Sequence, residues 1–342
     1  MRVTNIRMAQ YGTQHGHAAG KLLAMNTNQN VEVAGVFEPN EERRHQLQNS
    51  DGVFANLHWY ESKNEMLADP SILAIASEGR NIESLEQTEE IVNAGKHVWY
   101  DKPAGENWER WQRIVSIAES QRLQIQMGYM LRYHSAFKQI AEWTKSSFLG
   151  KVFSVRAHMS TCLPPEARFT IKQHMGGIFY DLGGHMLDQV VWLLGRPNKV
   201  TSFLRNDSDL VTGFSDNTLA VFEFPSAIAF IDIAAMESRP MARRFEVYGD
   251  QGSAIIVEPF EPGKNIRLCL KETKEGYKAG EQLITTKGEN RDQLYIFMPI
   301  LTGGSLNDFK DVVQKASLEE SQVAQLEGLL LTKLLEAVAE IN

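Results

Sequence analysis

The stretch GKHVWYDKPAG, residues 95–105, joins the end of a helix to a short strand and then to a rigid turn. Gly95 closes a helical pattern, as glycine often does just beyond a helix C-terminus. The apolar run 97–100 has the length and composition of a buried strand. Asp, Lys and Pro follow it at 101–103, and the proline fixes the backbone there. This order indicates one unit of a parallel α/β sheet, with a lysine at the edge where the strands end.

Four other strand-like segments alternate with helical ones in the first third of the chain. The expected strands are NIRMAQYG (5–12), VEVAGVFE (31–38), ILAIAS (72–77) and LQIQMGY (123–129). Alternation at this spacing is typical of βαβ units, in which helices cover both faces of a parallel sheet. We therefore predict a Rossmann-type doubly wound NAD(P)-binding domain over residues 1–125.

The pattern changes in the remainder of the chain. KVFSVRAHMS (151–160) alternates with period two, and from Lys199 onward strands follow one another with turns between them. Consecutive strands without helices indicate a mostly antiparallel sheet. Two helical patterns, 306–316 and 319–340, end the sequence. We predict that residues 126–342 form an α+β substrate-binding and oligomerisation domain with a large open sheet.

Composition and charge limit the classes of partner and compartment. The chain has 35 Lys and Arg against 43 Asp and Glu, a formal net charge of −8, which argues against nucleic acid or an anionic membrane as the main partner. Two cysteines without metal-binding spacing suggest a reduced compartment. No signal peptide and no apolar run of ~18 residues is evident. We expect a cytoplasmic protein.

A glycine-containing loop, YGTQHGHAAG (11–20), follows the first strand and opens a helix. In a doubly wound fold, this position holds the pyrophosphate of a dinucleotide. Gly12 matches the first glycine of the G-x-G-x-x-G pattern, whereas Gln14 and His17 replace the other two. By itself the loop fits a plain βα turn equally well. The predicted cofactor contacts are Gly12, Thr13, Gln14, His15, Gly16, Glu38, Ser77 and Lys102.

Glu38 ends the second strand, 26 residues after Gly12. An acidic residue at this point is suited to bind a ribose 2′-hydroxyl, and its charge repels a 2′-phosphate. We therefore favour NAD. NADP stays possible because Arg43 and Arg44 follow closely, and a solvated strand-end glutamate is the simpler alternative.

Lys102 is expected at the carboxyl edge of the sheet, where ligands bind. Pro103 restricts it to extended conformations. Near a positively charged nicotinamide, a partly desolvated lysine could polarise a substrate hydroxyl. The alternative is a surface lysine in a turn.

The segment HMGGIFYDLGGHMLDQVVWLLGRP (174–197) contains a second group of polar side chains. We expect a helix whose first turn holds His185, with Asp181 before it and 183–184 as the turn leading into it. An imidazole near a helix N-terminus tends to be neutral and can accept a proton. Alternatively, Asp181 is an N-cap and His185 a core residue. A metal site formed with Asp188 is conceivable, but no further ligands have suitable spacing, so no metal is predicted.

Three segments together resemble the glucose–fructose oxidoreductase/inositol dehydrogenase (Gfo/Idh/MocA) family. AGKHVWYDKPAG is similar to the family's A-G-K-H-V-x-x-E-K-P, GYMLRYHSAF to G-x-x-x-R-[FY]-x-P, and GGIFYDLGGHMLD to G-G-x-x-x-D-x-G-x-H-x-x-D. The resemblance covers essentially the whole chain. The sequence departs from it at Asp101, which replaces glutamate, at 130–131 and Ser135, and at 77–84 after the third strand, where Glu78 brings a negative charge toward the cofactor.

The resemblance implies an NAD(P)-dependent oxidoreductase acting on a CH–OH group of a sugar, cyclitol or related polyol. It implies that Lys102, Asp181 and His185 are catalytic, and that the Lys-Pro bond is cis. It also implies a homodimer or homotetramer formed through the open C-terminal sheet. Candidate substrate contacts are Arg132, His158, Arg168, Asp181 and His185.

Two alternatives remain at this point. The same residues would serve a lyase, epimerase or glycosidase that uses NAD without net redox change. The incomplete glycine loop would also fit a sugar-sensing dimer without catalysis. In each case the lysine and the imidazole are expected to reach one ligand.

Overall fold

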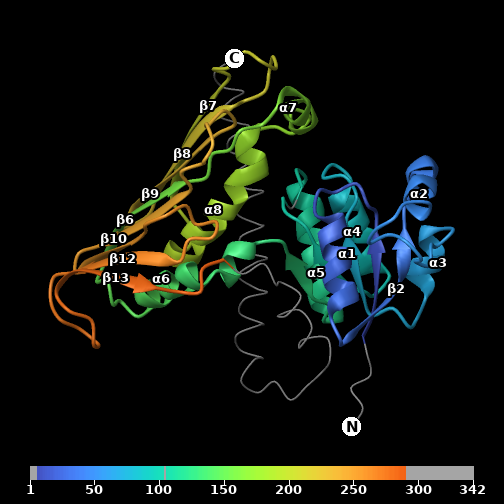
Figure 1. Cartoon of the computed structure of the whole chain (residues 1–342), viewed down its shortest axis with the longest axis horizontal. Helices are drawn as coiled ribbons and strands as arrows, with labels where there is room; N and C mark the ends of the chain where they lie inside the picture. Colours follow the sequence, from blue (N-terminus) through green and yellow to red (C-terminus); the bar gives the residue numbers. More distant parts are fainter. Residues whose placement is uncertain (1–5, 104, 290–342) are drawn as a thin grey trace, which may run out of the picture. The chain divides into compact units, whose positions relative to one another are not determined.

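The computed structural model describes residues 6–103 and 105–289. These residues divide into two compact units, one up to Gly128 and one from Tyr129 onward (Figure 1). The helices expected at 306–316 and 319–340 lie outside the described residues. The domain limits 1–125 and 126–342 therefore stay a prediction.

The first unit is built on five parallel strands in the order β2-β1-β3-β4-β5. The strands are β1 (Ile6–Tyr11), β2 (Val31–Phe37), β3 (Ala74–Ser77), β4 (His97–Tyr100) and β5 (Ile125–Met127). The order reverses beside β1, which creates the crevice where doubly wound sheets bind ligands at their carboxyl ends. The predicted Rossmann-type sheet is confirmed.

Five helices connect these strands, namely α1 (Ala18–Thr27), α2 (Glu41–Gln48), α3 (Lys63–Ala68), α4 (Ser84–Asn93) and α5 (Trp108–Gln121). Asn40, Ser62 and Asn107 cap α2, α3 and α5 with side-chain oxygens that accept a backbone N–H of the first turn. Helices α1 and α4 have no side-chain capping bond, and α1 also has no acidic residue in its first turn.

His97 at the start of β4 makes the stability of this unit depend on pH. Its Nδ1 accepts the backbone N–H of Gln124 at 2.8 Å, which requires a neutral ring in this tautomer. Burial lowers the pKa of His97 to about 4, from an ordinary value of 6.5. Between these values the unfolded chain takes up a proton that the folded chain does not, so stability falls as the pH falls.

We expect the free energy of unfolding to decrease by up to ~1.4 kcal/mol per pH unit below 6.5 from this histidine alone. Urea denaturation from pH 7 to 4.5 measures the slope. The variant His97→Asn keeps an acceptor for Gln124 but does not titrate, and should show a shallower slope. Equal slopes in the two proteins would contradict the assignment.

The second unit contains an eight-stranded sheet in the order β13-β12-β11-β10-β6-β9-β8-β7. Only β6 and β9 pair in parallel among these strands of the described region. The strands are β6 (Val152–His158), β7 (Lys199–Arg205), β8 (Asn217–Glu223), β9 (Ile228–Ala234), β10 (Arg244–Gly249), β11 (Gly252–Ile256), β12 (Asn265–Leu270) and β13 (Gly280–Thr285). The predicted large, mostly antiparallel sheet is confirmed.

Helices cover one face of this sheet (Figure 1). They are the 3-10 turn η1 (Met130–Tyr133), α6 (Ser135–Lys145), α7 (Pro165–Ile171) and α8 (Ile178–Leu194). Met186 and Val190 of α8 share a buried apolar cluster with Val155 and Ala157 of β6. In the central strands, buried residues alternate with more exposed ones, as expected for a sheet covered on one side. No helix in either described range is long and apolar enough to cross a bilayer.

Candidate functional site

The loop after β1 comes into backbone contact with the loop after β3. Gly12 has φ +85°, and a Cβ there would lie 2.6 Å from the backbone nitrogen of Gly79. No side chain fits at that distance, and L residues rarely adopt this conformation, so glycine is required. The first glycine of the pattern therefore has a clear steric reason.

The next residues of the loop leave space at the start of α1. A Cβ at Gly16 would meet no atom within 4 Å. The helix begins at Ala18 without a capping side chain or an acidic first turn. Free space at a helix N-terminus suits the pyrophosphate of a dinucleotide.

Glu38, directly after β2, is 1% exposed and holds the loop. Its carboxylate accepts the Thr13 hydroxyl at 2.5 Å and the Asn40 N–H at 2.9 Å, and the Gln14 amide lies 3.4 Å away. Arg43 donates to both the hydroxyl and the carbonyl oxygen of Thr13, each at 2.7 Å. Thr13 thus lies between an acidic and a basic side chain at the position expected for the adenosine ribose.

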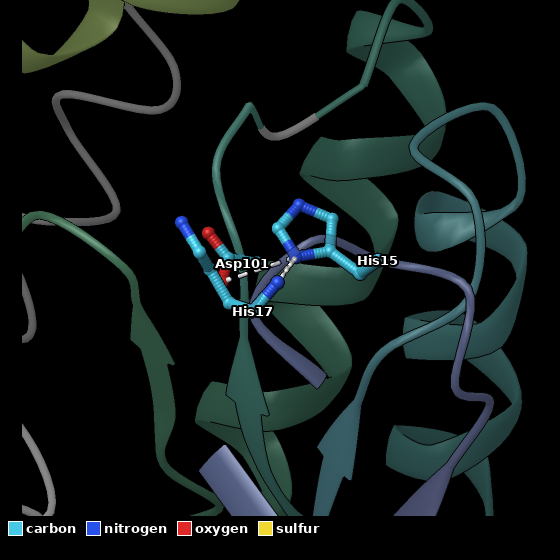
Figure 2. A group of neighbouring side chains, drawn as sticks. All are labelled: His15, His17 and Asp101. Carbon is cyan, nitrogen blue, oxygen red and sulfur yellow. Dashed lines mark hydrogen bonds and ion pairs between the residues drawn. The ribbon is translucent and has the colours of Figure 1, made fainter. Parts of the chain in front are cut away.

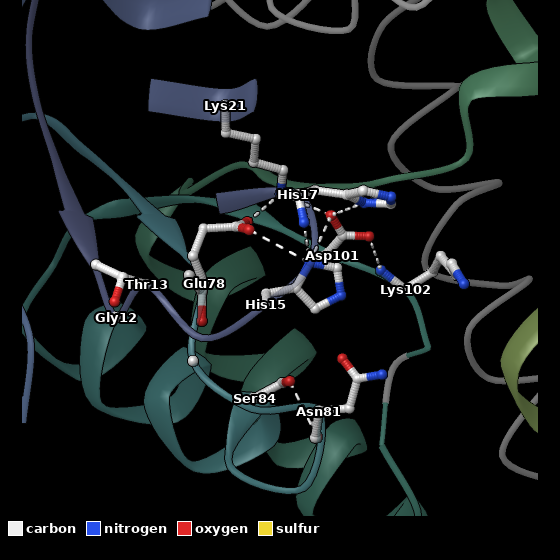
Figure 3. A network of polar contacts seen from close by, with 12 residues as sticks. Gly12, Thr13, His15, His17, Lys21, Glu78, Asn81, Ser84, Asp101 and Lys102 are labelled. Carbon is white, nitrogen blue, oxygen red and sulfur yellow. Dashed lines mark hydrogen bonds and ion pairs between the residues drawn. The ribbon is translucent and has the colours of Figure 1, made fainter. Parts of the chain in front are cut away.

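Two histidines of the loop join a network of ionisable side chains, which we call the loop cluster: His15, His17, Lys21, Glu78 and Asp101 (Figure 3). Lys21 Nζ lies 2.6 Å from Glu78 Oε1 and 3.3 Å from Asp101 Oδ2. His15 Nδ1 lies 3.4 Å from Glu78 Oε2 and 3.6 Å from Asp101 Oδ2. His17 Nδ1 lies 2.9 Å from Asp101 Oδ2. The cluster therefore links the ends of β3 and β4 to the β1–α1 loop and to α1.

Both Asp101 and Lys21 are buried and are kept charged by their neighbours. Burial opposes ionisation of Asp101, but Lys21 and the two histidines hold its pKa well below the ordinary value. Burial likewise opposes the charge on Lys21, and the two carboxylates raise its pKa above the ordinary value. The loop cluster is thus an ionic structure within the unit.

The sequence reasoning missed the loop cluster as a group. It named His15 as a cofactor contact and treated His17, Glu78 and Asp101 as departures from a family pattern. A signal was present: the departures occur at the ends of neighbouring strands that share one edge of the predicted sheet.

Lys102 follows the cluster. Its backbone N–H donates to Asp101 Oδ1 at 2.8 Å, and its peptide bond to Pro103 is cis, as the resemblance implied. Ser77, at the end of β3, is buried and donates to Oε1 of Gln87 at 3.3 Å. Cofactor contacts by these residues stay predictions.

In the second unit, the expected start of the helix around His185 is wrong. Helix α8 begins at Ile178, so Asp181 lies in its first turn and His185 lies further along. The turn into the helix is made by 176–177, where both glycines have positive φ, and a Cβ at Gly177 would lie 2.3 Å from the backbone oxygen of Ser215. The glycines at 183–184 are helical. His185 is buried, and its ring is nearly perpendicular to that of Tyr129 at a centroid distance of 6.4 Å.

Two arginines predicted to contact substrate are held in buried ion pairs. Arg132 donates to both oxygens of Asp188 at 2.7–3.0 Å. Arg168 lies 3.3 Å from Asp216 Oδ2 and also donates to the carbonyl oxygens of Leu163 and Ala235. Each guanidinium joins elements of the second unit. A substrate contact by either one stays a prediction.

His158 lies on a different side of the sheet from His185. Its neighbour Ala157 faces the core that includes α8, so His158 points to the open face. There it lies 2.5 Å from Asp232 and 3.2 Å from Glu237, and bonding to Asp232 raises its pKa. These three residues line a cavity of about 410 Å³. The structure does not bring His158 together with Asp181 and His185.

Two models of protein families together match most of the chain. The model described as "Oxidoreductase family, NAD-binding Rossmann fold" matches residues 7–129, and the "GFO/IDH/MocA C-terminal domain" matches residues 137–255. These matches confirm the resemblance seen in the three sequence segments, and with it a nicotinamide dinucleotide as cofactor.

Individual relatives are distant. An uncharacterized oxidoreductase of Schizosaccharomyces pombe is 29% identical over 46% of this chain, and the match spans only 43% of that protein. Myo-inositol 2-dehydrogenase of Thermotoga maritima is 24% identical over 74% of each chain. The crystal structure of an NAD-binding protein from Listeria innocua aligns with a TM-score of 0.74 at 21% identity, covering 98% of this chain and 97% of that one. At this identity the structural match shows the fold alone.

Proposed function

The chain belongs to the GFO/IDH/MocA family of NAD-binding oxidoreductases, and from this premise we propose that it transfers hydride between nicotinamide and a hydroxyl-bearing carbon of a sugar, cyclitol or related polyol. The substrate class is supported by the similarity to a myo-inositol 2-dehydrogenase. None of the observed contacts favours an NAD-assisted reaction without net redox change or a non-catalytic sensor over this reaction.

The first unit supplies the residues for the cofactor. Gly12 brings the loop close to the sheet, α1 directs its N-terminus to the free space beside Gly16, and Glu38 stands at the end of β2. When bound, the nicotinamide accepts or returns the hydride. The convergence of these three features on the carboxyl edge of the parallel sheet is the observation that carries the proposal.

The substrate chemistry is assigned to Lys102, Asp181 and His185. His185 takes the proton of the reacting hydroxyl as general base, since a neutral imidazole can do so near pH 7. Lys102 stabilises the developing alkoxide with its ammonium group. Asp181, one turn before His185 on α8, orients the imidazole or passes the proton on.

The test is a screen of sugars, sugar acids and inositols that follows nicotinamide absorbance with NAD and with NADP. We expect turnover with at least one compound. Calorimetric titration of each cofactor is run in parallel. Absence of binding by both would contradict the proposal, whereas tight binding without absorbance change on any substrate would favour a reaction without net redox change.

We expect a preference for NAD, because Glu38 would repel a 2′-phosphate. In the variant Glu38→Ala the ratio of the NADP and NAD dissociation constants should shift toward NADP by about tenfold, the effect of ~1.4 kcal/mol. The matched variant Arg43→Gln removes the basic side chain on the other side of Thr13 and should shift the ratio toward NAD. Calorimetry with both cofactors measures this. If the ratio of the two dissociation constants shifts in the same direction in both variants, the assignment is contradicted.

We also propose that the protein is cytoplasmic and forms a homodimer or homotetramer through the open face of the eight-stranded sheet. Phe203 and Leu283, each more than half exposed, support this assembly. Light scattering of the full chain gives the mass of the assembly.

A further inference from the structure

We propose that the loop cluster binds a divalent transition metal such as Zn²⁺, with His15, His17 and Asp101 as ligands. One nitrogen of each imidazole and one carboxylate oxygen lie within 4.8 Å of one another (Figure 2). Two imidazoles and a carboxylate are a ligand set that zinc and iron sites commonly use. This inference does not depend on the proposed function.

The distances fit a small tetrahedral site. Ligands ~2.0–2.1 Å from a tetrahedral zinc ion lie roughly 3.4 Å apart from one another. Asp101 Oδ2 lies 2.9 Å from His17 Nδ1 and 3.6 Å from His15 Nδ1. Small side-chain rotations would bring both edges to the required length.

Glu78 adjoins the site at His15 but is not among the three residues whose ligand atoms all lie within 4.8 Å of one another, so a water molecule would supply the fourth ligand. Glu78 Oε2 lies 3.4 Å from His15 Nδ1, and the side chain is fully buried. Its other oxygen, Oε1, lies 2.6 Å from Lys21 Nζ. Similarly, Asp101 Oδ1 accepts the Lys102 N–H, so Oδ2 is turned toward the histidines. Fixing the second oxygen of a carboxylate in this way is typical of groups around metal sites.

The charges of the loop cluster do not cancel, so the cluster can accept another cation. Glu78 and Asp101 carry two negative charges, Lys21 carries one positive charge, and neutral imidazoles add none. His17 Nδ1 and Asp101 Oδ2 form a hydrogen-bonded pair at 2.9 Å, and a metal ion would replace the proton that lies between them. Because metal binding releases protons from its ligands, the affinity for the metal should rise with pH.

Two contacts oppose the metal and limit its affinity. The backbone N–H of His17 donates to His15 Nδ1 at 3.1 Å, and metal binding must displace this bond. Lys21 Nζ lies 3.3 Å from Asp101 Oδ2 and repels a second cation. Access is available from one side, because the His17 side chain is 59% exposed whereas the carboxylates are buried.

The experiment titrates the full-length, metal-free protein with Zn²⁺ by calorimetry and with Co²⁺ by visible absorption, at pH 8 and pH 6. We expect one ion per chain, weaker binding at pH 6, and a Co²⁺ spectrum of a four-coordinate site without sulfur. His17→Ala and Asp101→Asn should each weaken binding at least ~100-fold. The control His45→Ala, an exposed histidine on α2, should bind as the native chain does.

Because Asp101 is buried, its variant could fail to fold, so the exposed His17→Ala is the deciding variant. Equal affinity of His17→Ala and the native chain would overturn the proposal. A sulfur-to-cobalt charge-transfer band would also overturn it, because it would place the ion on the exposed Cys162 or Cys269. Failure to bind either metal at pH 8 would overturn the proposal, because it would show that hydrogen bonds alone hold the side chains of the loop cluster together.

Discussion

Replacing His185 with alanine is expected to lower kcat on the true substrate by ~10²–10⁴, the range that positioned general bases contribute. NAD affinity should be unchanged, because His185 belongs to α8 of the second unit and the residues assigned to the cofactor belong to the first. Steady-state kinetics and calorimetric titration with NAD measure the two quantities on the same preparation.

The matched control for this experiment is His45→Ala, which removes an exposed imidazole from α2. Its kcat should equal that of the native enzyme. An undiminished kcat in His185→Ala would exclude the general-base role. A loss of NAD binding in the same variant would instead indicate that His185 acts on the fold or on the cofactor.

Replacing Asp188 with asparagine is expected to lower the free energy of unfolding by about 3–5 kcal/mol. Asp188 is fully buried in α8 and receives three short contacts from Arg132 of η1, and the Gln189 amide lies 2.8 Å from Oδ2. The substitution preserves the shape of the side chain but removes its charge, so the buried guanidinium loses this carboxylate. Urea denaturation of the full chain measures the change.

The double variant Arg132→Met/Asp188→Leu separates loss of the charge pair from loss of packing. Apolar side chains of similar volume often replace a buried ion pair at little cost. We therefore expect the double variant to recover most of the stability lost in Asp188→Asn. A double variant that is less stable than the single one would show that the ion pair itself stabilises the second unit.

The fold was predictable because it depends on patterns of period two and of helix–strand alternation. Segments 31–38 and 72–77 are mostly apolar, as is typical of strands covered on both faces, and β2 (Val31–Phe37) and β3 (Ala74–Ser77) lie within them. The second sheet was predictable because strands from Lys199 onward alternate in polarity. The family was predictable from the segments around Lys102, Arg132 and His185.

The start of α8 was not predictable from the local pattern. The glycine pair 183–184 was predicted to form the turn into the helix, but the pair 176–177 forms it. A tertiary contact fixes the turn there, since Gly177 packs against the backbone of Ser215, where a Cβ would lie 2.3 Å from the carbonyl oxygen. Sequence reasoning placed the turn seven residues too late for this reason.

The partners of buried charges were also inaccessible to sequence reasoning. Arg132 and Asp188 are 56 residues apart, and Arg168 and Asp216 are 48 apart. Arginines near a proposed active site suggest substrate binding, yet each of these also has a carboxylate supplied by a distant segment. These arginine–carboxylate pairs depend on how η1 and α7 pack against their neighbours, which the sequence pattern does not reveal.

The loop cluster has a further consequence for how fast a ligand can be captured. Its ion pairs tie the ends of β3 and β4 to the β1–α1 loop, so this edge of the sheet is already ordered when a ligand arrives. Little conformational entropy is then lost on association, and no slow ordering step precedes it. The dinucleotide should therefore bind in a single kinetic phase, at a rate that increases linearly with its concentration.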